Sequence, residues 1–151
     1  MYYTYDTPFG RISIVTDGEA ITHILPEDRI DKTAEKKATP LTDKAAAELS
    51  EYFDGKRREF SVPLSPKGTE FQKKVWNALI DVPYGETRTY KDIAVAVGSE
   101  KACRAVGLAN NRNPIWIIVP CHRIIGANGG LTGYGGGLDM KQKLLDLELR
   151  S

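Results

Sequence analysis

The stretch "TYKDIAVAVGSEKACRAVGLANN", residues 89–111, decides how the second half of the chain folds. Its first part, opened by Thr89 with Asp92 three residues later, has the pattern of a capped helix. Gly98 and Ser99 then interrupt the apolar spacing, and Ser99 can cap a second helix that runs to the end of the stretch. Two short helices joined by a tight glycine turn are typical of a helix-turn-helix. Many helical hairpins bind no nucleic acid, so the pattern alone leaves DNA binding open.

Small residues dominate the second helix, at Ala102, Ala105, Gly107 and Ala109. A small face lets a helix lie close to another backbone, either that of a neighbouring helix or that of a nucleic acid. Cys103, on the same helix, has no neighbouring base, and we interpret it as a packing residue.

Apolar and polar residues alternate in the first part of the chain, from Tyr3 to Leu25. Turn sequences at residues 7–10 and 17–18 divide this region into three short strands, which predicts an antiparallel hairpin or meander. His23 falls in the third strand, where a half-buried structural role is expected.

A charged stretch without periodicity, residues 26–40, predicts a surface loop before a helix over residues 41–56. Thr42 can cap the start of that helix, and Gly55 ends it. Residues 58–68 are interpreted as a short strand with a proline-rich exit.

We therefore expect two domains. The first, residues 1–65, is an α/β domain in which a small antiparallel sheet packs with a helix. The second, residues 66–151, is mainly α-helical and winged-helix-like, and it contains the helix-turn-helix. Thr69 and Gln72 form a capping box at the start of its first helix.

The composition is that of a globular protein, with 151 residues, 41% hydrophobic and 27% charged. Residues 1–66 carry a net charge of −3 and residues 67–151 a net charge of +4, which favours the second half for binding a polyanion. The sequence has no apolar run of membrane-spanning length and no signal-peptide pattern, so we expect a cytoplasmic protein with reduced thiols. Two cysteines and two histidines without ligand spacing predict no metal site.

The segment "IIVPCHRIIG", residues 117–126, ends an apolar run with a thiol, an imidazole and a guanidinium. A cysteine reacts as the thiolate, which an imidazole can generate and a guanidinium can stabilise. Cys121, His122 and Arg123 supply these groups on a chain that reads as extended, so His122 would reach the sulfur through a turn or a bridging water. Glu148, in the C-terminal helix, is the best candidate to orient the imidazole.

The glycine-rich segment "GANGGLTGYGGG", residues 126–137, follows the thiol. It lacks the lysine and hydroxyl residue of a phosphate-binding loop. Its glycines could fold closely over a flat ligand with Tyr134 as an aromatic wall, and a flexible surface loop is the alternative.

These motifs resemble those of the O6-alkylguanine-DNA alkyltransferases, also called methylated-DNA–protein-cysteine methyltransferases. "PCHRI", with "NRNPIWIIV" before it and "GGLTGYGGGLDMKQKLLDLE" after it, is similar to their active-site region. "VPYGETRTYKDIAVAVGSEKACRAVGLANNRNP" is similar to their helix-turn-helix. The resemblance is close over residues 66–148 and weaker before them. It implies a DNA repair protein that moves an alkyl group from guanine O6 to its own cysteine, once and without a cofactor.

The resemblance implies a role for each matching residue near the thiol. Cys121 would be the alkyl acceptor, His122 would take its proton through a water, and Glu148 would orient His122. Tyr90 would help to turn the base out of the duplex, and Asn113 would link the recognition helix to the active-site strand. Packing at a helix start remains the alternative for Tyr90, and a helix salt bridge remains the alternative for Glu148.

On the DNA side, the resemblance implies that Arg104 fills the gap left in the base stack. Ala105 and Gly107 of the same helix, together with Tyr90 and Arg123, would also contact DNA. An alkyl group on a base edge cannot be reached inside the duplex, so extrusion of the base is required. An ordinary surface charge is the alternative interpretation of Arg104.

The implied guanine pocket is lined by Val119, Pro120, Tyr134, Gly135 and Gly136. Gly135 stands where many relatives carry a serine that hydrogen-bonds guanine O6, so a backbone donor would have to replace it.

The expected partner is double-stranded DNA containing O6-alkylguanine, with O4-alkylthymine left open, and the protein is expected to act as a monomer away from membranes. Two other functions compete with this one. A lesion-binding module with an inert Cys121 would bind DNA without changing mass. An unrelated cysteine hydrolase using Cys121 and His122 would turn over without DNA.

Overall fold

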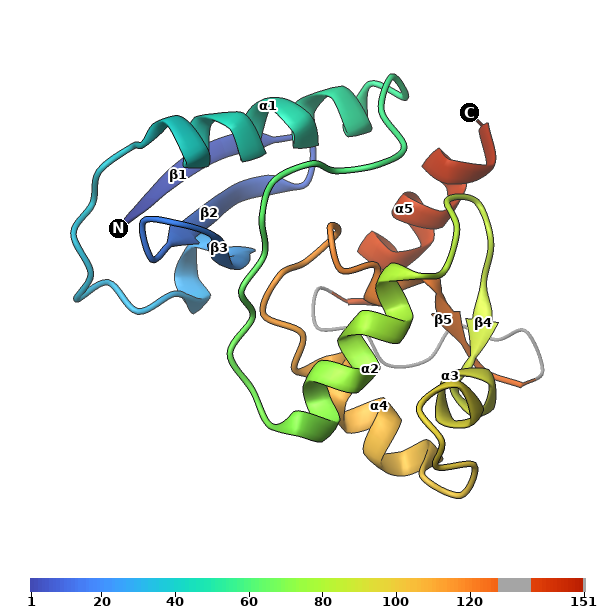
Figure 1. The fold of residues 1–151 in the computed structure, drawn as a ribbon. Helices are drawn as coiled ribbons and strands as arrows, with labels where there is room; N and C mark the ends of the chain where they lie inside the picture. The colour runs from blue at the N-terminus through green and yellow to red at the C-terminus, as the bar shows by residue number, and fades with distance from the viewer. Residues whose placement is uncertain (128–136, 151) are drawn as a thin grey trace. The chain divides into compact units, whose positions relative to one another are not determined.

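The computed structural model describes residues 1–127 and 137–150 (Figure 1). These residues separate into two compact units. Unit 1 comprises Met1–Lys67 and Pro114–Trp116, and unit 2 comprises Gly68–Asn113 and the described residues after Trp116. Within the described part of the chain, no helix is both long and apolar enough to span a membrane.

Unit 1 is built on a three-stranded antiparallel sheet of β1 (Tyr2–Thr7), β2 (Gly10–Thr16) and β3 (Ile21–Pro26), in that order. A 3-10 turn, η1 (Glu27–Arg29), follows β3. The helix α1 (Pro40–Phe53) runs along the sheet and buries its apolar side, which contains Ala45, Leu49 and Tyr52. The predicted three-stranded meander is confirmed.

The start of α1 differs from the sequence prediction. Thr39, not Thr42, is the N-cap: its side chain accepts a hydrogen bond from the Thr42 N–H, and the Thr42 hydroxyl accepts one from the Thr39 N–H. Thr39 precedes Pro40, whose fixed φ suits the first helical position. A threonine three residues after another threonine completes a capping box, so either could be mistaken for the cap.

Residues 58–68 do not form the predicted strand. Leu64 makes a single bridge to Ile21, and the segment is otherwise irregular. It is held instead by the buried carboxylate of Glu48, which accepts hydrogen bonds from the Ser61 N–H, at 2.9 Å, and from the Ser61 hydroxyl. This contact lies thirteen residues away in the sequence, so strand propensity could not reveal it.

Pro114–Trp116 returns to unit 1 beside β3. The Ile24 N–H donates to the Pro114 carbonyl at 2.8 Å, and the Trp116 N–H donates to the Ile24 carbonyl at 3.0 Å. The sequence analysis assigned residues 66–151 to the second domain, including Pro114–Trp116. No change in composition marks so short a segment of the first unit.

Unit 2 contains four described helices: α2 (Glu70–Ile80), α3 (Tyr90–Ala96), α4 (Cys103–Asn111) and α5 (Leu138–Arg150). A short parallel pair joins β4 (Arg88–Thr89) to β5 (Ile124–Ile125). The 3-10 turn η2 (Cys121–Arg123) directly precedes β5. The indole N–H of buried Trp76 donates to the Ala109 carbonyl at 2.9 Å, which fixes α2 against α4.

The helix-turn-helix is formed by α3 and α4. Capping boxes at Thr69 and Thr89 are present as predicted. The second helix, however, begins at Cys103 without a side-chain cap, and Ser99 lies in the preceding turn, where its N–H donates to the Ala94 carbonyl. The sheet-and-helix unit and the helical unit with a helix-turn-helix confirm the predicted fold class.

Candidate active site

Cys121, His122 and Arg123 form the 3-10 turn η2 immediately after Pro120. The Arg123 N–H donates to the Pro120 carbonyl at 3.0 Å and closes the turn. The sequence analysis expected an extended chain here, and the structure shows a 3-10 turn instead. Consecutive side chains of a 3-10 turn do not point to opposite faces, unlike those of an extended chain. Cys121 is 2% exposed and His122 is fully buried. The thiol and the imidazole therefore sit inside the protein.

The chain approaches this turn through a strained residue. Ile117 has φ of 73°, the one positive value among the described residues other than glycine. A β-branched residue in this conformation costs about 1–3 kcal/mol, so surrounding structure must hold it. Ile117 is buried, and its packing stabilises a bend that leads the backbone toward Cys121.

The imidazole of His122 is anchored by Glu148, which lies on α5 and is buried. His122 Nε2 is 2.6 Å from Glu148 Oε2. Because a carboxylate only accepts hydrogen bonds, this contact assigns the Nε2–H tautomer to neutral His122. The Gly85 N–H also donates to Glu148 Oε1, at 3.1 Å, from a turn in which Gly85 has φ of 79°, a conformation that favours glycine.

Arg123 completes the hydrogen bonding of Glu148. Its Nε donates to Oε1 at 2.8 Å, and its Nη2 donates to Oε2 at 3.0 Å. Nη1 donates to the Val82 carbonyl at 2.7 Å, and the guanidinium lies over the Tyr84 ring. At 6% exposure, this side chain is directed into the protein, which corrects the expected DNA contact. A fork-shaped guanidinium that satisfies both carboxylate oxygens fixes the carboxylate in place.

The environment of His122 keeps the ring neutral. Burial lowers the pKa of His122 below its ordinary value of 6.5, and the positive charges of Arg123 and Lys141 act in the same direction. The hydrogen bond and the charge of Glu148 oppose this lowering of the pKa. The other ring nitrogen, Nδ1, is buried and has no hydrogen-bond partner among the described residues. A neutral ring with Nε2 occupied leaves Nδ1 to accept a proton.

Lys141 is a functional candidate that the sequence reasoning missed. It lies on α5 with its side chain fully buried, and burial lowers its pKa from 10.5 to about 8. The negative charge of a Cys121 thiolate would oppose this change in pKa, so Lys141 lies within electrostatic range of the thiol. Lys141 shares helical spacing with buried Leu144 and with Glu148, so it falls on the apolar stripe of the helix. A lysine among the apolar positions of this helix was the sequence signal that could have indicated a buried, functional side chain.

Asn113 is bonded to the segment that leads to the thiol. Its side-chain N–H donates to the Val119 carbonyl at 2.8 Å, and both residues are buried. Pro120 is buried as well. Asn113 follows α4, and Val119 lies two residues before Cys121, so this bond ties the end of α4 to the thiol segment. That segment is irregular and not the strand that was expected.

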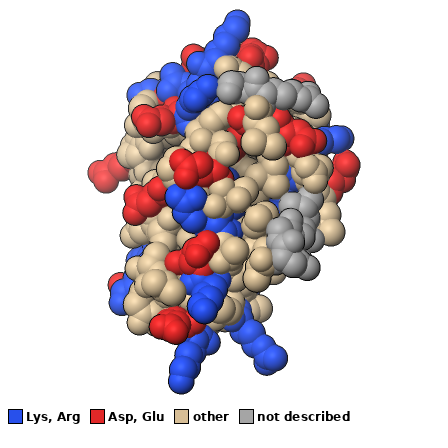
Figure 2. Space-filling view, turned by 90° about the vertical axis from the view of Figure 1, so that its right-hand side faces the viewer, with Lys and Arg blue, Asp and Glu red and all other residues tan. Residues whose placement is uncertain are grey.

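The expected DNA residues lie on or beside α4. Arg104 and Ala105 are exposed on this helix, and Tyr90 begins α3 directly after β4. A Cβ at Gly107 would lie 3.8 Å from the Tyr90 ring, so the ring rests close to the α4 backbone. Positive and negative side chains are interspersed on the face drawn in Figure 2, which therefore carries no large patch of one sign.

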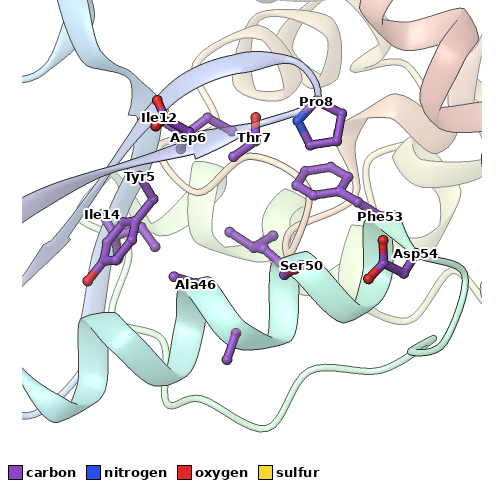
Figure 3. Close-up of a pocket in the computed structure, with 12 residues that line it drawn as sticks. Tyr5, Asp6, Thr7, Pro8, Ile12, Ile14, Ala46, Ser50, Phe53 and Asp54 are labelled. Atoms are coloured by element: carbon purple, nitrogen blue, oxygen red, sulfur yellow. The ribbon is translucent and has the colours of Figure 1, made fainter.

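A separate cavity of about 340 Å³ lies in unit 1, between α1 and the β1–β2 hairpin (Figure 3). Apolar side chains such as Ile12 and Phe53 form much of its lining, which includes no cysteine or histidine. Among the described residues, no group of three His, Cys, Asp or Glu side chains could hold a metal ion. In η2, by contrast, the thiol of Cys121 and the imidazole of His122 are consecutive, buried residues.

Tyr134, Gly135 and Gly136, which were expected to line the guanine pocket, lie outside the described residues. Of the expected pocket, the structure places Val119 and Pro120.

Comparison with known proteins matches both halves of the chain to one family. Residues 70–150 match the DNA binding domain of 6-O-methylguanine DNA methyltransferase, and residues 1–66 match its ribonuclease-like domain. The chain is 51% identical to a methylated-DNA–protein-cysteine methyltransferase of Methanosarcina acetivorans, with 98% of each covered. It is 50% identical to the constitutive methylated-DNA–protein-cysteine methyltransferase of Bacillus subtilis, with 97% of this chain and 94% of the relative covered.

Solved structures agree. Mycobacterium tuberculosis OGT in complex with DNA superposes with a TM-score of 0.93 at 46% identity, covering 99% of this chain and 92% of that one. With both family domains matched over nearly the whole chain, the protein belongs to the 6-O-methylguanine-DNA methyltransferase family.

Proposed function

We propose that this protein repairs DNA by transferring the alkyl group of O6-alkylguanine to the sulfur of Cys121. The observation that carries the proposal is a buried thiol followed directly in η2 by a buried, neutral imidazole, whose tautomer is set by Glu148, itself fixed by Arg123. This arrangement, in a chain of the methyltransferase family, supports thiolate chemistry and gives the inert-cysteine alternative no structural support.

The reaction begins with the proton of Cys121. His122 accepts it at Nδ1, through a water, while Nε2–H remains bonded to Glu148. The thiolate attacks the alkyl carbon, a C–S bond forms and the C–O6 bond breaks. The guanine leaves as an anion and takes up one proton. In the net reaction, the proton lost by the Cys121 thiol is gained by the guanine.

Lys141 supports the thiolate by charge. A cation buried near the sulfur favours the anion, because the same interaction that favours protonated Lys141 favours ionised Cys121. No hydrolysis follows, because water would have to expel the Cys121 thiolate from an unactivated alkyl carbon, and each molecule therefore acts once.

Access to the base requires extrusion from the duplex, at a few kcal/mol of lost stacking. We propose that α4 lies in the minor groove, that Tyr90 assists the rotation of the nucleotide and that Arg104 fills the vacated place. The exposed position of Arg104 and the closeness of Tyr90 to Gly107 support these roles. The protein is proposed to act as a monomer in the cytoplasm, where its thiols stay reduced.

The substrate class follows from the chemistry. The thiolate needs an alkyl group on an exocyclic oxygen whose base can leave as an anion. O4-alkylthymine meets this requirement and is proposed as a second, slower substrate, since the implied pocket is that of a purine.

The test is intact mass spectrometry after mixing the protein with a duplex that contains one O6-methylguanine. We expect one added methyl group per protein, no addition in Cys121→Ala, and normal addition in Cys103→Ala, which keeps the proposed acceptor. DNA binding with unchanged mass would overturn the proposal in favour of a lesion-binding module. Repeated turnover of an ester without DNA would overturn it in favour of a hydrolase.

A further inference from the structure

Leu108 stands out on the proposed DNA-binding helix. It is 61% exposed, the highest value for a large apolar side chain on α4. Val106 and Ala109 point to the interior of unit 2, and the Ala109 carbonyl accepts the hydrogen bond of Trp76. The packing of this helix therefore places Leu108 on the outer side, where most of its side chain stays exposed to solvent.

The neighbours of Leu108 identify the partner. Arg104, one turn earlier on the same face, is exposed, as are Ala105, Asn111 and Arg112. Single exposed leucines are common on protein surfaces and need no partner. This leucine differs because it lies among basic and small side chains on a face that suits a phosphate backbone.

We infer that Leu108 packs into the minor groove about two base steps from the extruded base, as an apolar contact that accompanies Arg104. This inference rests on the proposed function, in which α4 enters the groove. Minor-groove proteins often place leucine or another apolar side chain against base steps. Four helical residues span about 6 Å, close to the roughly 7 Å of two base steps, so Leu108 meets the groove about two steps from Arg104.

The chemistry of the groove gives this contact a sequence preference. The exocyclic amino group of guanine projects into the minor groove, whereas A·T pairs present only acceptors there. A bulky, apolar side chain that covers the groove floor desolvates that amino group without offering it an acceptor. Leu108 therefore favours A·T pairs about two steps from the alkylated base.

The experiment compares Leu108→Ala with Leu149→Ala, the same substitution at a 73% exposed position on α5. Both are made in a Cys121→Ala background, so that binding is measured without transfer. Fluorescence anisotropy gives Kd for duplexes with O6-methylguanine and either A·T or G·C pairs two steps away. Leu108→Ala should weaken binding to the A·T duplex about tenfold, remove the A·T preference and leave the salt slope unchanged, while Leu149→Ala changes nothing.

Three results would overturn the inference: equal Kd values for the two variants, an A·T preference that survives in Leu108→Ala, or a reduced salt slope in that variant. Folding is checked separately, in protein with Cys121 intact, by the rate of reaction with free O6-methylguanine base, which needs no groove contact and should match wild type. If wild-type protein fails to take up a methyl group from lesion DNA, the proposed function fails instead, and that result is obtained before any variant is made.

Discussion

Replacing Lys141 by methionine should make the protein more stable and less reactive at the same time. Burial lowers the pKa of Lys141 from 10.5 to about 8. This change corresponds to a destabilisation of the folded protein with protonated Lys141 by about 3 kcal/mol. Hydration and neighbouring dipoles reduce this figure, so we expect Lys141→Met to raise the free energy of unfolding at pH 7 by about 1–3 kcal/mol. Methionine keeps the length of the side chain and its packing.

The sign of the pH dependence follows from proton binding. Between pH 8 and 10.5 the unfolded chain holds a proton on Lys141 that the folded chain has lost, so the penalty fades as the pH rises. Urea unfolding at pH 7 and pH 9.5 should therefore show less than half of the gain at the higher pH. Lys143→Met, at an exposed position of the same helix, should change stability by less than about 0.5 kcal/mol.

Methyl transfer by Lys141→Met should slow by about tenfold, because the thiolate loses a nearby positive charge. Stability and transfer rate should thus move in opposite directions. A variant that is less stable than wild type at pH 7, or a gain that is equal at both pH values, would refute the reasoning that a charged lysine is buried here.

Three further predictions test the site. Burial lowers the pKa of His122 below 6.5, so the imidazole stays neutral and able to accept a proton at that pH. The rate of methyl transfer should therefore hold steady as the pH falls to 6.5 and decline only in more acid solution. A decline centred above pH 6.5 in a rapid-quench profile would contradict this. Asn113→Ala should cost about 0.5–1.5 kcal/mol in urea unfolding, since it removes one of two hydrogen bonds to the buried Val119 carbonyl, which keeps that from the Cys121 N–H, and unchanged stability would show that the lost bond contributes little. Methylation of Cys121 should lower Tm, because the added group overpacks a buried position. Calorimetry before and after reaction with lesion DNA measures this change, and an unchanged Tm would contradict the prediction.

Local rules predicted much of the fold. The turn at Gly10 and the capping boxes at Thr69 and Thr89 depend on residues within a few positions of each other, and each was readable from the sequence. Thr39 was missed because Thr42 offers the same side chain one turn later. Ser99 was taken for a cap because a hydroxyl after glycine fits that role, although the chain makes a further turn before α4.

The site depends on contacts that cross long stretches of sequence. Glu148 was proposed because a functional imidazole needs an orienting group, but the inward direction of Arg123 depends on the Val82 carbonyl, which lies 41 residues away. The positive φ of Ile117 could not be predicted, since β-branched residues avoid that region. Such strain is held by packing that only the folded unit supplies.

The charges at the thiol suit a protein that reacts once. Once His122 has taken the proton of Cys121, the cations of Arg123 and Lys141 are matched by the carboxylate of Glu148 and by the Cys121 thiolate. Alkylation removes the thiolate charge for good and leaves Lys141 buried without that counter-charge. An enzyme that turned over would regenerate the anion, so the cost of burying the lysine would be offset again in every cycle. Here the offset is lost when repair is complete, which makes the spent protein less stable through electrostatics as well as through overpacking.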